Sequence, residues 1–194
     1  MRRFGKWLFV LTLILVPAIA SAQSFAIDPA HTTVGFSVKH FGVSNVSGAF
    51  SDVTGTLEWD GKNLESAKTE IKIAAKSVDT RTQKRDDHLR SADFFEVAKY
   101  PSIAFKSKSV KLTGQNTATV VGDLTIKAIT KEVTLDVTFN GTMDDPWGNE
   151  RAGFSATGKL NRHDWGVTAP NTVDKAIGDE IKITIETEFT RPKK

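Results

Sequence analysis

Apolar and polar side chains alternate along most of this chain, with the two-residue period that is typical of β-strands. In residues 131–143, for example, Val133 and Leu135 alternate with Thr134 and Asp136. Eight runs of this kind, bounded by Gly, Asn, Asp or Pro, cover residues 32–40, 46–59, 66–78, 102–112, 118–127, 131–143, 151–162 and 179–190.

Each run has one apolar face and one polar face, which indicates antiparallel strands around a single interior. Eight such strands can form either a sandwich or a closed barrel, and only a barrel leaves no exposed sheet edge. The apolar parity changes once, near Ser51 and Asp52 in the second run, which predicts a β-bulge there. We therefore expect an all-β fold, an eight-stranded antiparallel barrel.

Residues 77–105 interrupt the alternation between the third and fourth strands. Thr80, followed by Gln83 three residues later, predicts the start of a short helix with a capping box. Phe94 and Phe95 follow, between charged residues. They either anchor this helical insertion in the core or form part of the wall or lid of an interior channel.

The inward-facing positions mix bulky residues such as Phe36 and Phe139 with small ones such as Gly48 and Ala75. The small residues either let opposite bulky side chains interlock or leave a narrow apolar channel. Composition alone leaves both alternatives open.

The first residues predict a cleaved Sec-type signal peptide, because basic residues precede an apolar run at 7–16 and a small-residue site at 20–22. A spanning helix needs about 20 apolar residues, so an uncleaved membrane anchor is the weaker interpretation. Cleavage after Ala22 would leave residues 23–194 as one barrel domain in the periplasm.

The charge balance changes when this segment is removed. The whole chain has 26 Lys and Arg against 23 Asp and Glu, and the segment contains three of the basic residues and no acidic one. A mature chain without a positive excess is atypical of nucleic-acid or polybasic membrane-surface binders. There is no Cys, and the four His are scattered, so we expect neither disulfides nor a metal site.

Several segments in order along the chain resemble the signature of the YceI-like family. They are Asp28 with His31-Thr32, Arg85-Asp86-Asp87-His88-Leu89-Arg90-Ser91-Ala92-Asp93-Phe94-Phe95, Lys99-Tyr100-Pro101-Ser102-Ile103-Ala104-Phe105, Gly122-Asp123-Leu124-Thr125-Ile126, Asn161-Arg162 with Gly166-Val167, and Ile177-Gly178-Asp179. Three departures are visible: Thr32 replaces the more usual Ser, Ala128 a usual Gly, and Trp165 a Phe or Tyr.

The resemblance implies a lipocalin-like barrel in the periplasm that binds a polyisoprenoid or a similar long-chain amphiphile, such as an isoprenoid quinone, a prenyl lipid or a fatty-acid derivative. It implies this lipid as the ligand and no other cofactor. The partners to expect are this hydrophobic molecule, a second copy of the chain, and transient contact with a membrane or a membrane-bound redox partner, with no nucleic acid.

The residues that we expect to line the apolar channel come from the inward faces and the insertion. They are Phe36, Val38, Phe50, Leu57, Ile71, Ile73, Phe94, Phe95, Ile103, Phe105, Leu124, Ile126, Leu135, Phe139, Phe154 and Trp165. The candidates for contact with a polar head group are His40, Arg85, Asp87, His88 and Arg162.

Other roles remain open for the head-group candidates. His88 is equally suited to a structural network of the insertion, and Arg162 to pairing with Asp164 or Asp179. No sequence motif of a hydrolase or nucleotide-binding enzyme is present, and we expect no catalytic residue. The alternatives to a carrier are a hydrolase or isomerase that uses His88 with Asp86 or Asp87, and an interaction protein whose barrel is filled.

Overall fold

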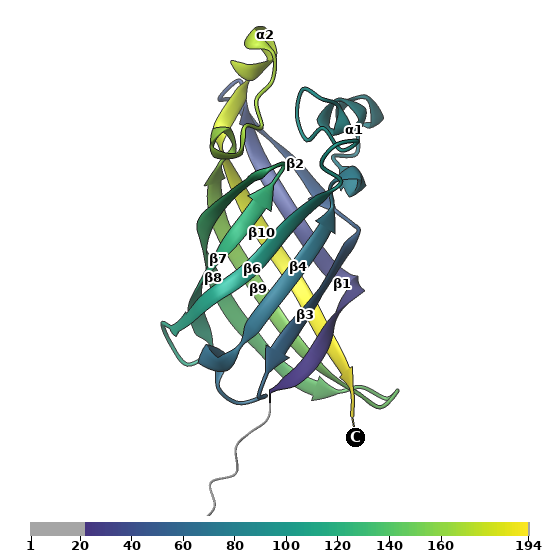
Figure 1. Cartoon of the computed structure of the whole chain (residues 1–194), viewed down its shortest axis with the longest axis vertical. Coiled ribbons are helices and arrows are strands. Elements are labelled where there is room, and N and C mark those ends of the chain that lie inside the picture. Colours follow the sequence, from purple (N-terminus) through teal and green to yellow (C-terminus); the bar gives the residue numbers. More distant parts are fainter. Residues whose placement is uncertain (1–21, 194) are drawn as a thin grey trace, which may run out of the picture.

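The computed structural model describes residues 22–193. The predicted signal peptide, residues 1–22, lies outside them except for Ala22. The described chain folds into one tall barrel with short helices at one end (Figure 1). Its strands are β1 (Gln23–His40), β2 (Ser44–Phe50), β3 (Val53–Trp59), β4 (Lys68–Ala74), β5 (Val78–Asp79), β6 (Ser102–Leu112), β7 (Thr117–Ile126), β8 (Ile129–Asp144), β9 (Asn149–Asn161) and β10 (Ile177–Pro192).

Eight of these strands form the closed wall. Their order is β10-β9-β8-β7-β6-β4-β3-β1, every pairing is antiparallel, and the β10–β1 pairing closes the ring. The predicted eight-stranded antiparallel barrel is therefore confirmed. No helix in residues 22–193 has the length and apolar character needed to cross a bilayer.

The first strand is longer than predicted. β1 starts at Gln23, pairs with β3 through residues 23–26 and with β2 through residues 34–40. Asp28 and Pro29 resemble a turn in sequence, but they lie within β1. The pairing of β1 with β10 shifts in register between Asp28 and Thr33. The predicted second strand is correspondingly divided into β2 and β3 at Ser51-Asp52, where we expected only a bulge.

The short helices are α1 (Gln83–Arg90) and α2 (Asn171–Asp174), with 3-10 turns η1 (Leu64–Ser66), η2 (Ala75–Ser77) and η3 (Arg162–Trp165). Helix α1 lies between the third and fourth predicted strands, as expected. The predicted N-cap at Thr80 is wrong, because Thr82 occupies that position without a side-chain cap. Thr80 is buried instead, and the Asp86 carboxylate accepts hydrogen bonds from its N–H (2.8 Å) and its hydroxyl (2.5 Å).

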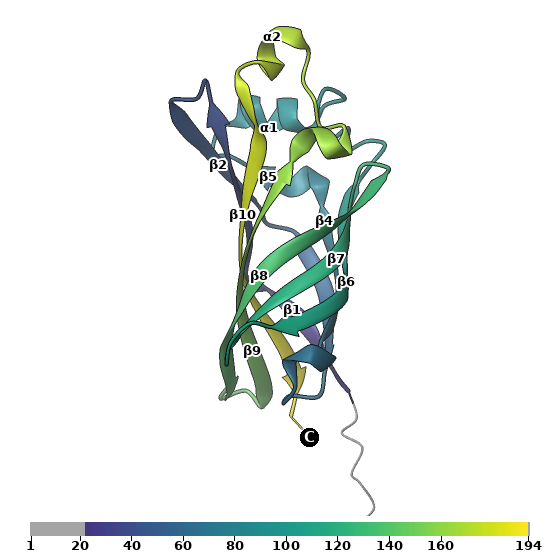
Figure 2. The ribbon, with the colours of Figure 1, turned by 90° about the vertical axis from the view of Figure 1, so that its left-hand side faces the viewer.

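Two apolar clusters occupy the barrel at different heights. The cluster near α1 includes Phe50, Phe94 and Trp165. The second cluster lies where β1 begins and β10 ends, and includes Phe25, Trp59 and other rings described below. Figure 2 shows α1, α2 and the β1–β2 turn at the opposite end of the barrel from the C-terminus.

Candidate functional site

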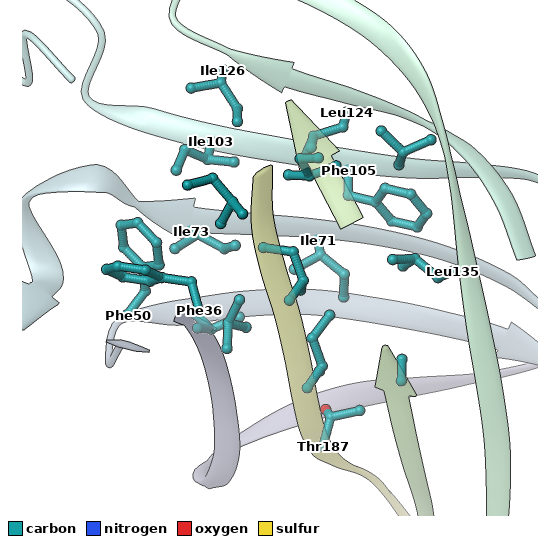
Figure 3. Close-up of a pocket in the computed structure, with 18 of the residues that line it drawn as sticks. Phe36, Phe50, Ile71, Ile73, Ile103, Phe105, Leu124, Ile126, Leu135 and Thr187 are labelled. Atoms are coloured by element: carbon teal, nitrogen blue, oxygen red, sulfur yellow. The ribbon is translucent and has the colours of Figure 1, made fainter. Parts of the chain in front are cut away.

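The barrel encloses one large cavity of about 800 Å³. This volume is within the range of about 300–1,000 Å³ that is usual for sites of small organic ligands. Aliphatic and aromatic side chains from the strands point into it (Figure 3). The interior is therefore not filled by the protein's own side chains, which was one of the alternatives left open by the sequence.

The structure places all sixteen predicted channel residues on the wall of this cavity. Phe36, Phe50, Ile71, Phe105 and Leu135 are among those visible in Figure 3. Phe94 is buried in the core near α1 and also lines the cavity, so both roles considered for it apply. Contact of these residues with a ligand stays a prediction.

Sequence reasoning omitted one side of the wall. Ile181, Ile183, Ile185 and Phe189 of β10 line the cavity, as does Thr187, whose hydroxyl is hydrogen-bonded to that of Thr32 on β1 at 3.0 Å. The sequence of β10 could have predicted these lining residues, because its apolar and polar residues alternate as regularly as those of the strands from which residues were chosen.

Aromatic rings close the end of the cavity away from α1. The rings of Trp59 and Phe139 lie 5.3 Å apart, as do those of Phe139 and Phe154, and Phe154 contacts Phe189 at 6.0 Å. Trp59 is almost completely buried, and its indole N–H donates to the carbonyl oxygen of Asn63. We call Trp59, Phe139, Phe154 and Phe189 the aromatic floor.

Charged and titratable side chains line the cavity only at the α1 end, which we call the mouth. They come from β1, α1 and η3, and they are Lys39, His40, Lys84, Arg85, His88 and Arg162. No Asp or Glu of residues 22–193 lines the cavity. The mouth therefore has basic side chains around an otherwise apolar interior.

Helix α1 positions three of these side chains. Lys84 and His88 are one helical turn apart and therefore lie on the same face. The Arg85 Nε donates to the Thr80 hydroxyl and its Nη2 to the Thr80 carbonyl oxygen (2.7 and 2.8 Å), whereas its Nη1 donates to no described residue. The Lys84 ammonium likewise has no partner within residues 22–193.

The other predicted head-group residues differ in their surroundings. His40 contacts the Phe41 ring at 4.5 Å, and its ring nitrogens make no hydrogen bond to a described residue. His88 Nε2 lies 2.8 Å from an Asp93 oxygen, and its ring meets the Phe94 ring edge-on. Asp87 does not line the cavity and is exposed beside Arg90 and Gln83.

Arg162 is buried and bonded throughout its guanidinium group. It forms a salt bridge with Asp174 at 2.5 Å and lies 3.3 Å from an oxygen of Asp179. It also donates to four backbone carbonyls, those of Val167, Asp174, Ile177 and Gly178. The hydrogen bond from Arg162, with help from the Ala169 N–H, lowers the pKa of Asp174 to about 2. A head group would have to displace one of these partners to reach Arg162.

The acid–base pair considered for an enzyme is not formed. Asp86 is buried against Thr80, and Asp87 is directed to Gln83 and Arg90, whereas His88 pairs with Asp93. Another group, Asp28, His31 and Glu188, brings ligand-type atoms within 4.8 Å of one another. Arg151 Nη1 already donates to Asp28 and Glu188 there (2.8 and 2.9 Å), and this bond, with that from His31, lowers the pKa of Asp28 to about 2.

Comparison with known proteins identifies relatives over almost the whole chain. Residues 25–189 match the family model of the YceI-like domain. A UPF0312 protein of Pseudomonas putida is 40% identical over 174 residues, which cover 89% of this chain and 91% of that protein.

Solved structures with the same fold include a YceI protein of Campylobacter jejuni, 33% identical with a TM-score of 0.69 over 80% of this chain and 90% of that one. A domain from Saccharophagus degradans, described as polyisoprenoid-binding and implicated in plant cell wall breakdown, matches with a TM-score of 0.63. It is 14% identical and covers 87% of this chain and 98% of that one, a likeness that shows the fold.

Proposed function

This chain belongs to the YceI-like family, and on that basis we propose that it binds a polyisoprenoid or a similar long-chain amphiphile in its barrel. The observation that carries this proposal is the apolar cavity of about 800 Å³ that ends at the aromatic floor. A cavity of this shape suits a linear tail that enters from the mouth. The S. degradans domain, described as polyisoprenoid-binding, has the same fold and supports this class of ligand.

Burial of the tail supplies enough free energy for tight binding. At about 30 Å³ for each water-sized group, the cavity accommodates roughly 25 such groups. Each buried CH₂ contributes about 0.8 kcal/mol, so a tail of about twenty carbons contributes about 16 kcal/mol before costs are subtracted. Association and ordering oppose binding by roughly 4–15 kcal/mol, which leaves a favourable balance without any chemical step.

The mouth supports an acidic head group, a carboxylate or a phosphate. Lys84, Arg85 and His40 offer donors that no described residue uses, and no carboxylate lines the cavity to repel an anion. The predicted contacts of His88 and Arg162 with the head group would require rearrangement of bonds that they already make. Asp87 does not line the cavity, so it would contact the head group only if its bonds to Gln83 and Arg90 rearranged.

The cellular role that we propose is a periplasmic carrier. It depends on export by residues 1–22, which cell fractionation and the mass of the mature N-terminus would test. The homodimer and the membrane-bound redox partner stay predictions. No contact in the described residues favours the hydrolase or isomerase, because His88 pairs with Asp93 rather than with Asp86 or Asp87.

Native mass spectrometry and lipid extraction of the protein purified from its expressing bacterium test the ligand. We expect an apolar adduct in the wild-type protein and none in Ala156→Phe, which places a ring in the cavity from β9. Thr157→Phe is the matched control, since position 157 is exposed on the same strand and should leave the adduct in place.

Circular dichroism and thermal melting show whether Ala156→Phe still folds, because overpacking costs about 1–3 kcal/mol. A wild-type protein that carries no lipid, and that takes up neither a prenyl lipid nor a fatty acid from detergent, would contradict the proposal. Recovery of a chemically altered lipid after incubation would instead favour the hydrolase or isomerase.

A further inference from the structure

Two large apolar side chains are exposed at the tip of the β1–β2 turn. Phe41 and Val43 are 68% and 85% exposed. The Phe41 N–H donates to the carbonyl oxygen of Ala176 at 2.8 Å, which joins this turn to the segment after α2. Val173, within α2, is 38% exposed. Figures 1 and 2 both place this turn and α2 at the end of the barrel that carries α1.

The exposed tip is continuous with the mouth of the cavity. Lys39 and His40, which directly precede Phe41, line the cavity, and so do Val173 and Ala176. Phe41 and Val43 themselves are outside the lining. They therefore extend the apolar surface of the interior onto the outer rim, in the direction from which a tail would enter.

The backbone of this turn is unusual at one residue. Gly42 adopts φ +73° without steric cost, whereas Phe41 has φ +49°, in the left-handed region, which bulky side chains rarely adopt. Such a conformation costs of order 1 kcal/mol and tends to persist where function requires it. Here it maintains an aromatic ring in solvent at the rim, where a polar residue would be the less costly choice.

The same end carries basic side chains that lack partners. Lys39, Lys84, Lys175 and Arg81 form no ion pair with any residue of 22–193. Of the acidic groups nearby, Asp174 pairs with Arg162 and Asp87 with Arg90, and Asp79 accepts a hydrogen bond from the Arg81 backbone N–H without forming an ion pair within residues 22–193. The rim thus combines exposed apolar tips with unpaired positive charge.

We propose that this rim (Phe41, Val43, Val173, Arg81 and Lys175) docks onto the surface of a bilayer that contains acidic lipids. The apolar tips enter the interface, and the basic residues lie against the lipid phosphates, each contributing to binding. This inference rests on the proposed function, because a long-chain ligand that passes directly from bilayer to cavity avoids exposing its tail to water.

The other end of the barrel provides a control. Met143 and Trp147 are 62% and 78% exposed near the β8–β9 turn, so the apolar exposure there is similar. Next to these residues the basic side chains are paired, Lys193 with Asp144, Arg191 with Glu150 and Arg151 with Asp145, whereas Lys62 and Lys111 at the same end form no ion pair within residues 22–193. Apolar exposure alone therefore does not distinguish the two ends, whereas the cavity mouth and the unpaired basic side chains that line it do.

Vesicle flotation tests the proposal, with wild-type and variant proteins that share the same N-terminus. Vesicles contain either phosphatidylethanolamine with phosphatidylglycerol or phosphatidylcholine alone. We expect binding to the acidic vesicles only, weakening with added salt. The double variant Phe41→Ser/Val43→Ser should bind at least tenfold more weakly, and Arg81→Gln/Lys175→Gln about fivefold more weakly for each charge removed.

The variant Met143→Ser/Trp147→Ser should bind like the wild type. Equal loss in this control, no loss in the two rim variants, or equal binding to both kinds of vesicle would overturn the docking proposal. A parallel assay of lipid uptake from detergent separates it from the proposed function. Phe41→Ser/Val43→Ser should retain that uptake, whereas failure of the wild type to take up lipid would count against the function itself.

Discussion

At the mouth of the cavity, single side chains differ in how much of their hydrogen-bonding capacity the protein already uses. Arg162 donates to carbonyls and carboxylates on every side. Arg85 uses its Nε and Nη2 but not its Nη1, and Lys84 uses none of its donors within the described chain. A ligand that binds Lys84 therefore breaks no existing bond of this side chain.

Lys84→Gln should weaken binding of a long-chain fatty acid about fivefold, the factor that corresponds to about 1 kcal/mol for an exposed ion pair. Binding of the alcohol of the same chain length should change little, because it carries no negative charge at the mouth. Titration of both ligands by fluorescence displacement measures the two affinities.

Lys111→Gln is the control, since Lys111 is exposed on β6 toward the other end of the barrel. Equal effects of Lys84→Gln on acid and alcohol would show that no anion lies beside this residue.

Among the elements, the strands were more predictable than their interruptions. The alternation of apolar and polar residues indicates which face of a strand is buried. This was enough to predict the barrel and the channel wall. It does not report where a long strand changes partner, which is why β1 was predicted nine residues too short at its start. Of the two predicted partners of Arg162, Asp179 contacts it at 3.3 Å. The nearer partner, Asp174, was missed for a related reason, because it reaches Arg162 from α2 across an irregular loop.

The insertion depends on the contact between Thr80 and Asp86. Asp86→Ala should lower the free energy of unfolding by about 2 kcal/mol, because it leaves the buried N–H and hydroxyl of Thr80 without their acceptor. Hydrogen exchange should accelerate first in residues 79–101, since this contact joins the start of the insertion to α1, although Arg90 still donates to the carbonyls of Lys76 and Val78.

Asp87→Ala is the matched control. The Asp87 carboxylate is adjacent in sequence but exposed, so its removal should change the free energy of unfolding very little. Denaturant unfolding and exchange mass spectrometry provide the two measurements. Unchanged exchange in the Asp86 variant would mean that other contacts hold the insertion in place.

For the whole molecule, the aromatic floor sets the depth of the cavity. Phe139 packs between Trp59 and Phe154, and its removal should extend the space available to a tail. Phe139→Ala should cost about 3 kcal/mol of stability. The lipids recovered from the Phe139→Ala protein should have tails longer by roughly six carbon atoms, because the substitution removes the six carbons of the ring.

Mass spectrometry of the extracted lipids gives the chain-length distribution directly. Asn140→Ala, at the exposed position that follows Phe139 on β8, should leave the distribution unchanged. An unchanged distribution in Phe139→Ala would show that the tail ends above the floor.

The wall closes between the two strands that are farthest apart in the sequence. Ala26 of β1 lies opposite Thr190 of β10, so the seam joins the first strand to be synthesised to the last. A chain that is still growing, or one that has lost its final segment, cannot complete the ring, however well its other strands pair. The cavity is therefore enclosed only after β10 has paired with β1, and until then the chain remains open, as the proposed export in unfolded form would require.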